Sequence, residues 1–282
     1  MSEGAYPNIR FSGHLGLAAP DAPLFAHSAA SSAPPDQIRY LAAQGFSGLF
    51  DPYVKMRSPL QQAEISRALQ DFGLCFGTFN NDLAHWNQPV WNVKSADGTR
   101  LLKTSLSSSA DILRQFPQAK AVCVTGADAS QSHEQQMDAM IRNLQDHADE
   151  AQASGLTLLV EAVAPQWIDG LFVTHTEQAA EIVRAVGHPA VRLLFDTGHS
   201  ALSGEDVLHQ LDSHWDIIDT IQLADTPARC APGQGTLAWD EIFRLLAQRQ
   251  FDGAVELEFQ PLPSRQGEAD IMPNLRKFLS EK

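Results

Sequence analysis

The chain has 282 residues, of which 34 are acidic and 20 are basic, so its formal net charge is −14, and 44% of the residues are hydrophobic. This hydrophobic share excludes a disordered chain, and an acidic chain without clustered Lys and Arg is not suited to bind nucleic acid. The length fits two small domains or one large α/β domain.

The cysteines and the apolar runs bear on where the protein works. Cys75, Cys123 and Cys230 lie far apart and form no Cys-x-x-Cys pair, which is not a disulfide framework. The N-terminal residues lack the apolar stretch of a signal peptide. No apolar run approaches the ~18 residues that a membrane span requires. We therefore expect a cytoplasmic protein in a reducing compartment, with no membrane contact.

Short apolar runs alternate with longer stretches of helical periodicity, and eight such units follow one another along the chain. The predicted strands cover residues 9–16, 46–52, 75–80, 121–126, 156–164, 191–198, 220–225 and 254–259. Several helical stretches between them end at a glycine, which is a common stop signal. These glycines are Gly45, Gly73, Gly155, Gly187 and Gly253.

Eight units in 282 residues give about 35 residues per unit, the size expected of a (β/α)8 TIM barrel. We therefore predict an α/β protein with a single TIM-barrel domain over residues 1–282. The alternative is a doubly wound parallel sheet, which favours a glycine-rich phosphate-binding turn after the first strand. The text at that point, GHLGLAAPDAP, has no such turn.

Four residues with strong oxygen ligands stand late in the last four predicted strands, where barrel strands are otherwise apolar. They are Glu161, Asp196, Gln222 and Glu258. Their spacings of 35, 26 and 36 residues each amount to about one strand–helix unit. Because barrel enzymes place their sites at the C-terminal ends of the strands, we expect the four side chains to converge. Glu256 shares the inward face of its strand with Glu258 and is expected to lie deeper.

Three carboxylates and one amide oxygen in one place repel each other unless a cation lies among them. An all-oxygen set suits a hard divalent ion, Mg²⁺ or Mn²⁺, with open positions for water or substrate, whereas zinc prefers His or Cys ligands. The alternative is that each residue is separately hydrogen-bonded or salt-bridged. Four such residues in consecutive units favour a site for one divalent ion.

The chain resembles the sugar isomerase/epimerase barrels of the xylose isomerase-like superfamily, and among them the hydroxypyruvate isomerases and related keto-acid isomerases. The resemblance is carried by LLVEAVAP, FDTGHS, IQLADTPAR followed by PGQGTLAWDEIF, and VELEFQP, with FDPY and NNDLAHWNQP nearer the N-terminus. It implies one divalent ion held by Glu161, Asp196, Gln222 and Glu258. It also implies that Glu161 and Glu258 form the acid/base pair. Barrels of this type often form homo-oligomers, and nothing in the sequence decides the oligomeric state.

Substrate contacts are expected from the loops after the strands. The resemblance implies that His199, three residues after Asp196, and Arg229 contact substrate oxygens. If the substrate carries a carboxylate, the guanidinium fork of Arg229 would clamp it. Trp86 either covers the apolar face of a sugar carbon chain or packs its own loop.

Lys55, Arg57 and His85 are weaker candidates for the site. His14, in the first predicted strand, either reaches the floor of the pocket or is a buried structural histidine.

Three positions depart from the pattern of the superfamily. Thr220 stands where a His is usual, Ala164 stands where an Asn is usual, and Cys230-Ala231-Pro232 replaces a His-Glu-Pro segment. These differences leave the predicted metal ligands intact and leave the substrate open.

The predicted chemistry is proton transfer next to a carbonyl group. An α-hydroxy carbonyl can chelate a metal ion through both oxygens, which makes the adjacent C–H more acidic. Glu161 and Glu258 would remove and return the proton through an enediolate, and His199 would stabilise the enediolate oxygens.

We therefore predict a metal-dependent aldose–ketose type isomerase of a small α-hydroxy aldehyde or ketone, such as a hydroxypyruvate-like keto acid or a ketose. The alternatives are a ketose 3-epimerase, a metal-dependent dehydratase or lyase on the same barrel, and a non-catalytic binding protein. Sequence hardly separates the isomerase from the epimerase, because both share the enediolate. The dehydratase would begin with the same proton abstraction and then expel a hydroxide.

Overall fold

The computed structural model describes residues 9–261 and 265–279. Residues 1–8, in which we expect no signal peptide, lie outside this part. The strands are β1 (Arg10–His14), β2 (Gly48–Phe50), β3 (Cys75–Phe76), β4 (Thr78–Asn80), β5 (Lys120–Cys123), β6 (Thr157–Glu161), β7 (Val191–Asp196), β8 (Ile218–Leu223) and β9 (Ala254–Leu257).

The helices follow the strands in alternation. They are α1 (Pro34–Gln44), α2 (Pro59–Phe72), α3 (Ala96–Leu113), α4 (His133–Ser154), α5 (Thr176–Val186), α6 (Thr197–Leu202), α7 (Val207–Ser213), α8 (Trp239–Gln248), α9 (Arg265–Ala269) and α10 (Ile271–Leu279), with a single 3₁₀ turn at Val54–Met56. Among the described helices, none combines the length and the apolarity that crossing a membrane would take.

The chain divides into two compact units, which are described separately. Unit 1 comprises Met1–Pro52, Arg57–Gly77 and Thr220–Lys282, and unit 2 comprises Tyr53–Met56 and Thr78–Asp219. In unit 1 the strand order is β3-β2-β1-β9-β8, and in unit 2 it is β7-β6-β5-β4. Neighbouring strands within each unit pair in parallel. Parallel strands joined through helices confirm the predicted α/β class.

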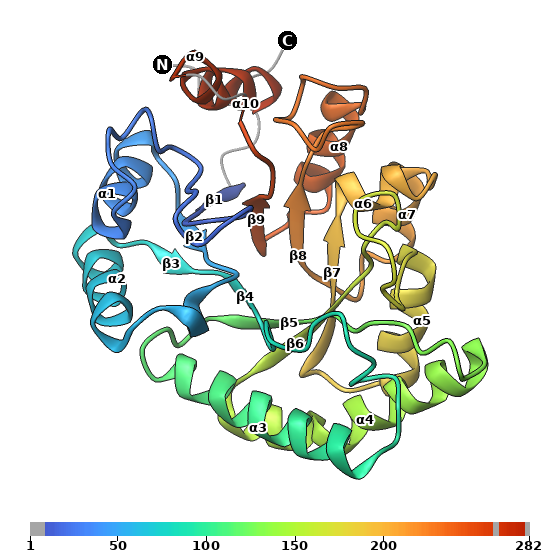
Figure 1. Ribbon diagram of the computed structural model, residues 1–282. Coiled ribbons are helices and arrows are strands. Elements are labelled where there is room, and N and C mark those ends of the chain that lie inside the picture. The colour runs from blue at the N-terminus through green and yellow to red at the C-terminus, as the bar shows by residue number, and fades with distance from the viewer. Residues whose placement is uncertain (1–8, 262–264, 280–282) are drawn as a thin grey trace. The chain divides into compact units, whose positions relative to one another are not determined.

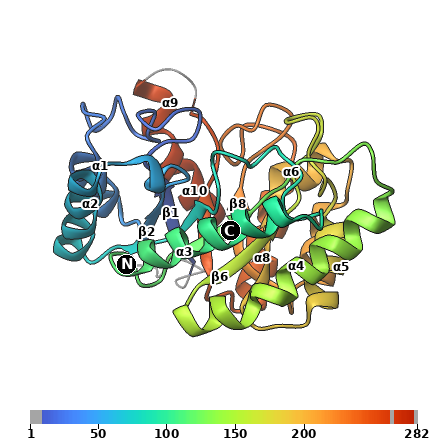
Figure 2. The same ribbon diagram turned by 60° about the horizontal axis from the view of Figure 1, so that its bottom comes forward.

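Amphipathic helices cover the strands of each unit. In unit 1, α1 lies beside α2 and buries Ile38 and Leu41 (Figure 1). In unit 2, α4 and α5 lie side by side in both views and pack against β6 and β7 (Figures 1 and 2). Because helices shield one face of the strands and the other face is buried as well, the strands are apolar along most of their length.

The inward face of unit 2 leads from the core to the site. Val122 of β5, Leu159 of β6 and Leu194 of β7 form one buried cluster. Side chains two residues apart in a strand share a face. Glu161 therefore extends the face of Leu159, and Asp196 extends the face of Leu194. β6 and β7 therefore each end with a carboxylate, on the same face that carries a leucine two residues earlier.

The predicted strand over 75–80 is wrong in one respect, because Gly77 interrupts it and leaves β3 and β4 as two short segments. The glycine at the break also leaves room for a nearby side chain of unit 1. A Cβ atom on Gly77 would lie 2.2 Å from Oε1 of Glu256 and 3.3 Å from the carbonyl oxygen of Leu49. A side chain at residue 77 would therefore displace the Glu256 carboxylate, which takes the space that a Cβ atom would fill.

Helix ends confirm most of the predicted stops. Four of the five predicted glycines follow a helix in the left-handed conformation: Gly45, Gly73, Gly155 and Gly187. The prediction for Gly253 is wrong, because α8 ends at Gln248, and Gln250, with φ of 53°, makes the left-handed turn instead. Helix α3 lies between the third and fourth predicted strands, as the predicted alternation requires, and the side chain of Ser95 caps it by accepting from the backbone N–H of Gly98.

Ser132 begins the long helix α4 with a reciprocal capping box. Its hydroxyl accepts from the backbone N–H of Gln135, and the Gln135 side chain accepts from the backbone N–H of Ser132. We expect Ser132→Ala to lower the free energy of unfolding by about 1 kcal/mol, measured by urea denaturation. Ser132→Thr keeps the hydroxyl and should recover most of the loss. Equal stability of the alanine variant and the wild type would contradict the assignment.

Candidate active site

The ends of β6 and β7 place two carboxylates in unit 2. Glu161 is the last residue of β6 and Asp196 the last of β7, and both are buried, at 8% and 4% exposure. Helix α6 begins immediately after Asp196, whose carboxylate accepts from the backbone N–H of His199 at 2.7 Å. An aspartate at this position caps the helix. The capping bond therefore fixes the carboxylate at the end of the strand.

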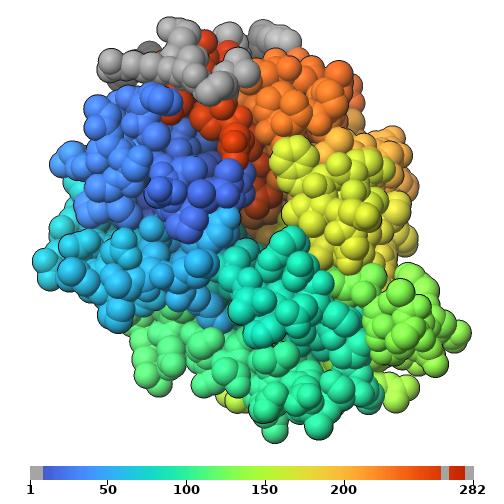
Figure 3. Space-filling view, viewed as in Figure 1, coloured from blue at the N-terminus to red at the C-terminus, as the bar shows by residue number. Residues whose placement is uncertain are grey.

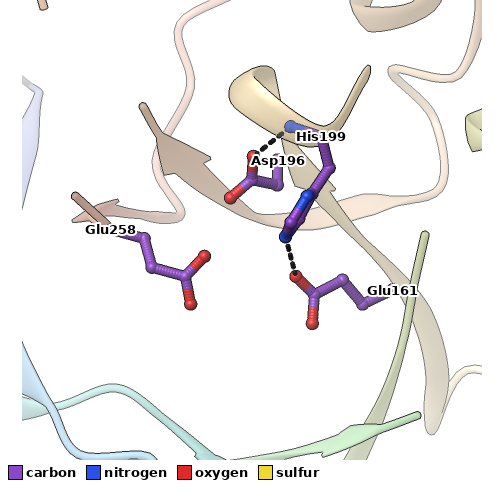
Figure 4. A group of neighbouring side chains, drawn as sticks. All are labelled: Glu161, Asp196, His199 and Glu258. Carbon is purple, nitrogen blue, oxygen red and sulfur yellow. Dashed lines mark hydrogen bonds and ion pairs between the residues drawn. The ribbon is translucent and has the colours of Figure 1, made fainter. Parts of the chain in front are cut away.

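His199 lies on the first turn of α6, and its ring is oriented by a backbone donor. The N–H of Ala164 donates to Nδ1 at 3.3 Å, so the lone pair on that nitrogen is used. The ring is then neutral and carries its proton on Nε2. Figure 4 shows Nε2 facing the carboxylate of Glu161, and the distance to Oε1 is 3.9 Å. In this arrangement His199 is a hydrogen-bond donor, as its predicted contact with substrate oxygens requires.

The three side chains of unit 2 form a compact group that could hold a metal ion. One ligand atom from each of Glu161, Asp196 and His199 lies within 4.8 Å of the others. Two buried carboxylates at this separation disfavour each other's charged form unless positive charge is close. The neutral imidazole of His199 brings none. The group therefore fits a cation held by carboxylate oxygens.

In unit 1, Gln222 of β8 offers a further oxygen. Its Nε2 donates to Oε2 of Glu256 at 3.0 Å. Its Oε1 is buried and has no hydrogen-bond partner among the described residues. A buried acceptor left unpaired costs about 1–3 kcal/mol. An oxygen in this state is suited to a cation, so the chemistry of Gln222 fits the predicted metal.

Glu258, just after β9 in unit 1, is held by Arg229. The guanidinium donates to the Glu258 carboxylate at 2.6 Å and to its carbonyl oxygen at 3.1 Å. Both side chains are buried or nearly so, at 4% and 13% exposure. A charge-assisted bond of this kind fixes the direction of a carboxylate. The predicted contact of Arg229 with substrate stays a prediction, and the structure adds a role in orienting Glu258.

The loop that carries Arg229 is organised by Asp225, which the sequence analysis did not single out. Its carboxylate is fully buried and accepts from five backbone N–H groups and one indole N–H, at 2.7 to 3.1 Å. The donors are Thr226, Gly233, Gly235, Thr236, Leu237 and the ring of Trp239.

Two backbone bonds between Asp225 and Cys230 close the turn in which Arg229 lies. The signal in the sequence is an aspartate shortly before a glycine-rich segment, since Asp side chains commonly accept from nearby backbone N–H groups.

The two weaker basic candidates have structural partners. In unit 1, Arg57 donates to the buried carboxylate of Asp51 and to the carbonyl of Pro20. In unit 2, the Lys55 amine donates to the carbonyl oxygens of Asn81 and Ser105. Burial lowers the pKa of Lys55 to about 8. These contacts explain both residues as anchors of the segment after β2.

The remaining candidates lie in the loop between β4 and α3 and in β1. Residues 81–95 (teal) lie on the face shown in Figure 3. There Trp86 is half-buried, and Nδ1 of His85 bonds to Asp82 at 2.9 Å. The predicted contact of Trp86 with a substrate stays a prediction.

His14 of β1 is buried, and its contacts favour the structural one of the two interpretations that the sequence left open. Its Nε2 lies 3.1 Å from the carbonyl oxygen of Phe259, and its ring packs edge-on against Phe50. Burial lowers the pKa of His14 to about 4, and the bond to Phe259 opposes this shift in part.

Comparison with known proteins bears on the fold and on the family. A family model described as a xylose isomerase-like TIM barrel matches residues 38–280, which confirms the predicted (β/α)8 fold. The crystal structure of an AP endonuclease of family 2 from Brucella melitensis superposes with a TM-score of 0.79, at 20% identity over 94% of this chain and 98% of that one. D-psicose 3-epimerase from Clostridium cellulolyticum gives 0.73, at 14% identity over 88% and 94%. The IOLI protein with a bound zinc atom gives 0.67, at 18% identity over 86% and 91%.

Curated relatives are enzymes of small hydroxylated compounds. Hydroxypyruvate isomerase of Escherichia coli is 27% identical over 149 residues, 52% of this chain and 58% of that protein. A Streptomyces coelicolor protein, provisionally named a hydroxypyruvate isomerase, is 25% identical over 268 residues, 91% of this chain and 92% of that protein. Inosose dehydratase 1 of Bacillus cereus is 28% identical over 134 residues, 40% and 45% of the two chains. The chain spans about half the length of the E. coli and B. cereus relatives.

Asp225 yields a first prediction for this region. Asp225→Asn places an NH₂ group among N–H donors, so we expect the free energy of unfolding to fall by about 3 kcal/mol and the 225–239 loop to become sensitive to limited proteolysis. Asp149→Asn removes the same charge from a side chain that is 99% exposed and should leave both measurements unchanged. A wild-type cleavage pattern and stability for Asp225→Asn would refute this role.

His14 yields a second prediction, on the pH dependence of stability. Its folded pKa of about 4 lies below its ordinary value of 6.5. Below pH 6.5 the unfolded chain therefore binds the proton first, and stability falls until about pH 4. The loss amounts to about 3 kcal/mol. His14→Asn should flatten this part of the curve of unfolding free energy against pH, whereas the exposed variant His209→Asn should follow the wild type. A His14→Asn curve parallel to the wild type would contradict the prediction.

Proposed function

The chain belongs to the xylose isomerase-like TIM barrel family, and from this membership we propose that it is a divalent-metal-dependent isomerase of a small α-hydroxy aldehyde or ketone. The substrate class is a hydroxypyruvate-like keto acid or a ketose. The observation that carries the proposal is the pair of buried carboxylates, Glu161 and Asp196, with ligand atoms within 4.8 Å of each other at the ends of two neighbouring parallel strands. Active sites of TIM barrels are built at this end of the strands.

We propose that one divalent ion is held by Glu161 and Asp196 from unit 2 and by Gln222 and Glu258 from unit 1. All four residues offer oxygen, which favours Mg²⁺ or Mn²⁺ over zinc. The unpaired Oε1 of Gln222 supports this set. The bond from the Ala164 N–H to Nδ1 of His199 supports leaving this residue outside the set. It assigns the ring proton to Nε2, and a protonated nitrogen does not bind a metal.

In this proposal, Glu161 and Glu258 move the proton. One carboxylate takes it from the carbon next to the carbonyl group, and the other returns it to the neighbouring carbon. Arg229 holds the Glu258 carboxylate in one direction, at 2.6 Å, which suits a base that acts through position. His199 donates from Nε2 to an oxygen of the deprotonated substrate. The bound cation supplies positive charge that makes the substrate C–H more acidic.

Substrate binding is proposed for His199, Arg229 and Trp86. The guanidinium of Arg229 is a fixed positive charge with 4% exposure, next to a proposed catalytic carboxylate. A buried cation at this place favours a substrate that carries a carboxylate, since guanidinium and carboxylate form paired hydrogen bonds. A keto acid is therefore preferred over a neutral ketose.

A dehydratase is the second candidate, and the relative named inosose dehydratase favours it. It would share the proton abstraction and then expel hydroxide from the next carbon. Incubation with short keto acids and ketoses in D₂O separates the candidates. An isomerase product carries solvent deuterium on carbon and otherwise has the mass of the substrate. An epimerase product has one inverted centre, with the carbonyl group on the same carbon. A dehydratase product is lighter than the substrate by one water.

The proposal predicts about one Mn²⁺ or Mg²⁺ per chain and loss of activity on chelation that either ion reverses. Glu258→Gln should lower turnover by roughly 10²- to 10⁴-fold, because the proton acceptor is lost. Metal content is measured by elemental analysis, and turnover by the panel above. Glu64→Gln, on an exposed face of α2, is the matched control and should retain full turnover. Full activity of the protein after chelation of its metal would contradict the proposed metal-dependent mechanism.

A further inference from the structure

Glu256 is a buried carboxylate that the proposed chemistry does not use. It lies on β9 directly opposite Gln222 on β8, and the two residues are 0% and 2% exposed. Its Oε2 accepts the Nε2–H of Gln222 at 3.0 Å. The contact is therefore a buried hydrogen bond between facing residues of two paired strands. With Glu256 ionised, the bond is charge-assisted and stronger than one between neutral groups.

This bond decides which end of the amide faces Glu256. An amide has an NH₂ end that only donates and an oxygen that only accepts, whereas an ionised carboxylate only accepts. Turning the Gln222 amide by half a turn would set its oxygen against the oxygens of Glu256, which repel it. The NH₂ end is thus held toward Glu256, and Oε1 is held away from it. That Oε1 is buried and unpaired among the described residues.

We propose that Glu256 is a positioning residue that fixes the Gln222 amide so that its oxygen is presented to the cation. The inference rests on the proposed function, because it assigns to Gln222 the role of a metal ligand there. Residues that orient metal ligands through hydrogen bonds commonly change metal affinity by roughly 10- to 100-fold. The bond also draws electron density toward Oε1, which makes a neutral amide oxygen a better ligand.

Gly77 shows that the position of Glu256 is itself constrained. A Cβ atom at residue 77 would lie 2.2 Å from Oε1 and 3.3 Å from Cδ of Glu256. The carboxylate therefore packs against bare backbone on the side away from Gln222. The backbone N–H of Gly77 donates to Leu49 at 2.6 Å, which holds this segment in place. The missing side chain of Gly77 leaves the space in which the carboxylate is accommodated.

The test measures Mn²⁺ binding directly, by titration calorimetry on the full chain, and does not depend on activity. In Glu256→Gln the new amide can either accept or donate, so the Gln222 amide is free to turn. We expect Mn²⁺ to bind roughly 10- to 100-fold more weakly than to the wild type. Glu64→Gln on the surface removes the same charge and should bind Mn²⁺ as the wild type does.

A second background shows whether Glu256 acts through Gln222. Gln222→Met removes the ligand oxygen, so Glu256→Gln should cause no further loss of Mn²⁺ affinity in that background. An equal loss in both backgrounds would mean that Glu256 acts by its charge alone, and the proposal would be overturned. Glu256→Asp keeps the negative charge, but its side chain is too short to reach Nε2 of Gln222, so it should also weaken Mn²⁺ binding. This variant replaces Glu256→Gln if the latter does not fold.

The outcomes separate this inference from the proposed function. A wild-type chain that binds no Mn²⁺ and no Mg²⁺ refutes the proposed function. A wild-type chain that binds Mn²⁺ while the folded Glu256 variants bind it equally well refutes the positioning role alone. Weaker binding by the Glu256 variants, absent in the Gln222→Met background, supports both.

Discussion

A carboxylate at the end of a buried strand has to be matched by positive charge or by N–H donors, because its removal from water otherwise costs several kcal/mol. Four buried or nearly buried carboxylates of the chain find such partners in different ways. Asp196 caps a helix, Glu258 accepts from Arg229, Glu256 accepts from Gln222, and Asp225 accepts from its own loop. Each of these donors also fixes the direction of the carboxylate that it binds. The same hydrogen bonds therefore compensate the buried charge and orient the side chain.

The parallel strands make this arrangement compact. β6 and β7 are apolar over the three residues before their last one, and a carboxylate then follows at the C-terminal end of each. Leu159 and Glu161 share one face of β6, and Leu194 and Asp196 share one face of β7. In both strands, a core residue and a proposed site residue are therefore only two positions apart. The carboxylates inherit the rigidity of the packed strands beneath them.

The fold was predictable because its signals are periodic and local. Alternating apolar runs and glycine stops are read along the chain, and they identify the strands that carry Glu161 and Asp196. The close approach of the Glu256 carboxylate to Gly77 was not predictable, because the two residues lie 179 positions apart in the chain. Arg229 was predicted to contact the substrate, but its ion pair with Glu258 was not predicted. The role of Asp225 was also not predicted, because it depends on how the following loop folds back onto its carboxylate. Contacts between distant residues leave no local pattern.

The bond between Glu256 and residue 222 places few demands on what stands at that position, since a carboxylate accepts from any N–H donor. An imidazole there would donate one nitrogen to the same carboxylate and present the other outward, which is the common support of metal-bound histidines. Replacing the amide oxygen by such a nitrogen would shift the ligand set toward zinc. In the proposed site, the choice between an oxygen and a nitrogen ligand would therefore depend on the residue at position 222 of β8, and the hydrogen bond to Glu256 would support either one.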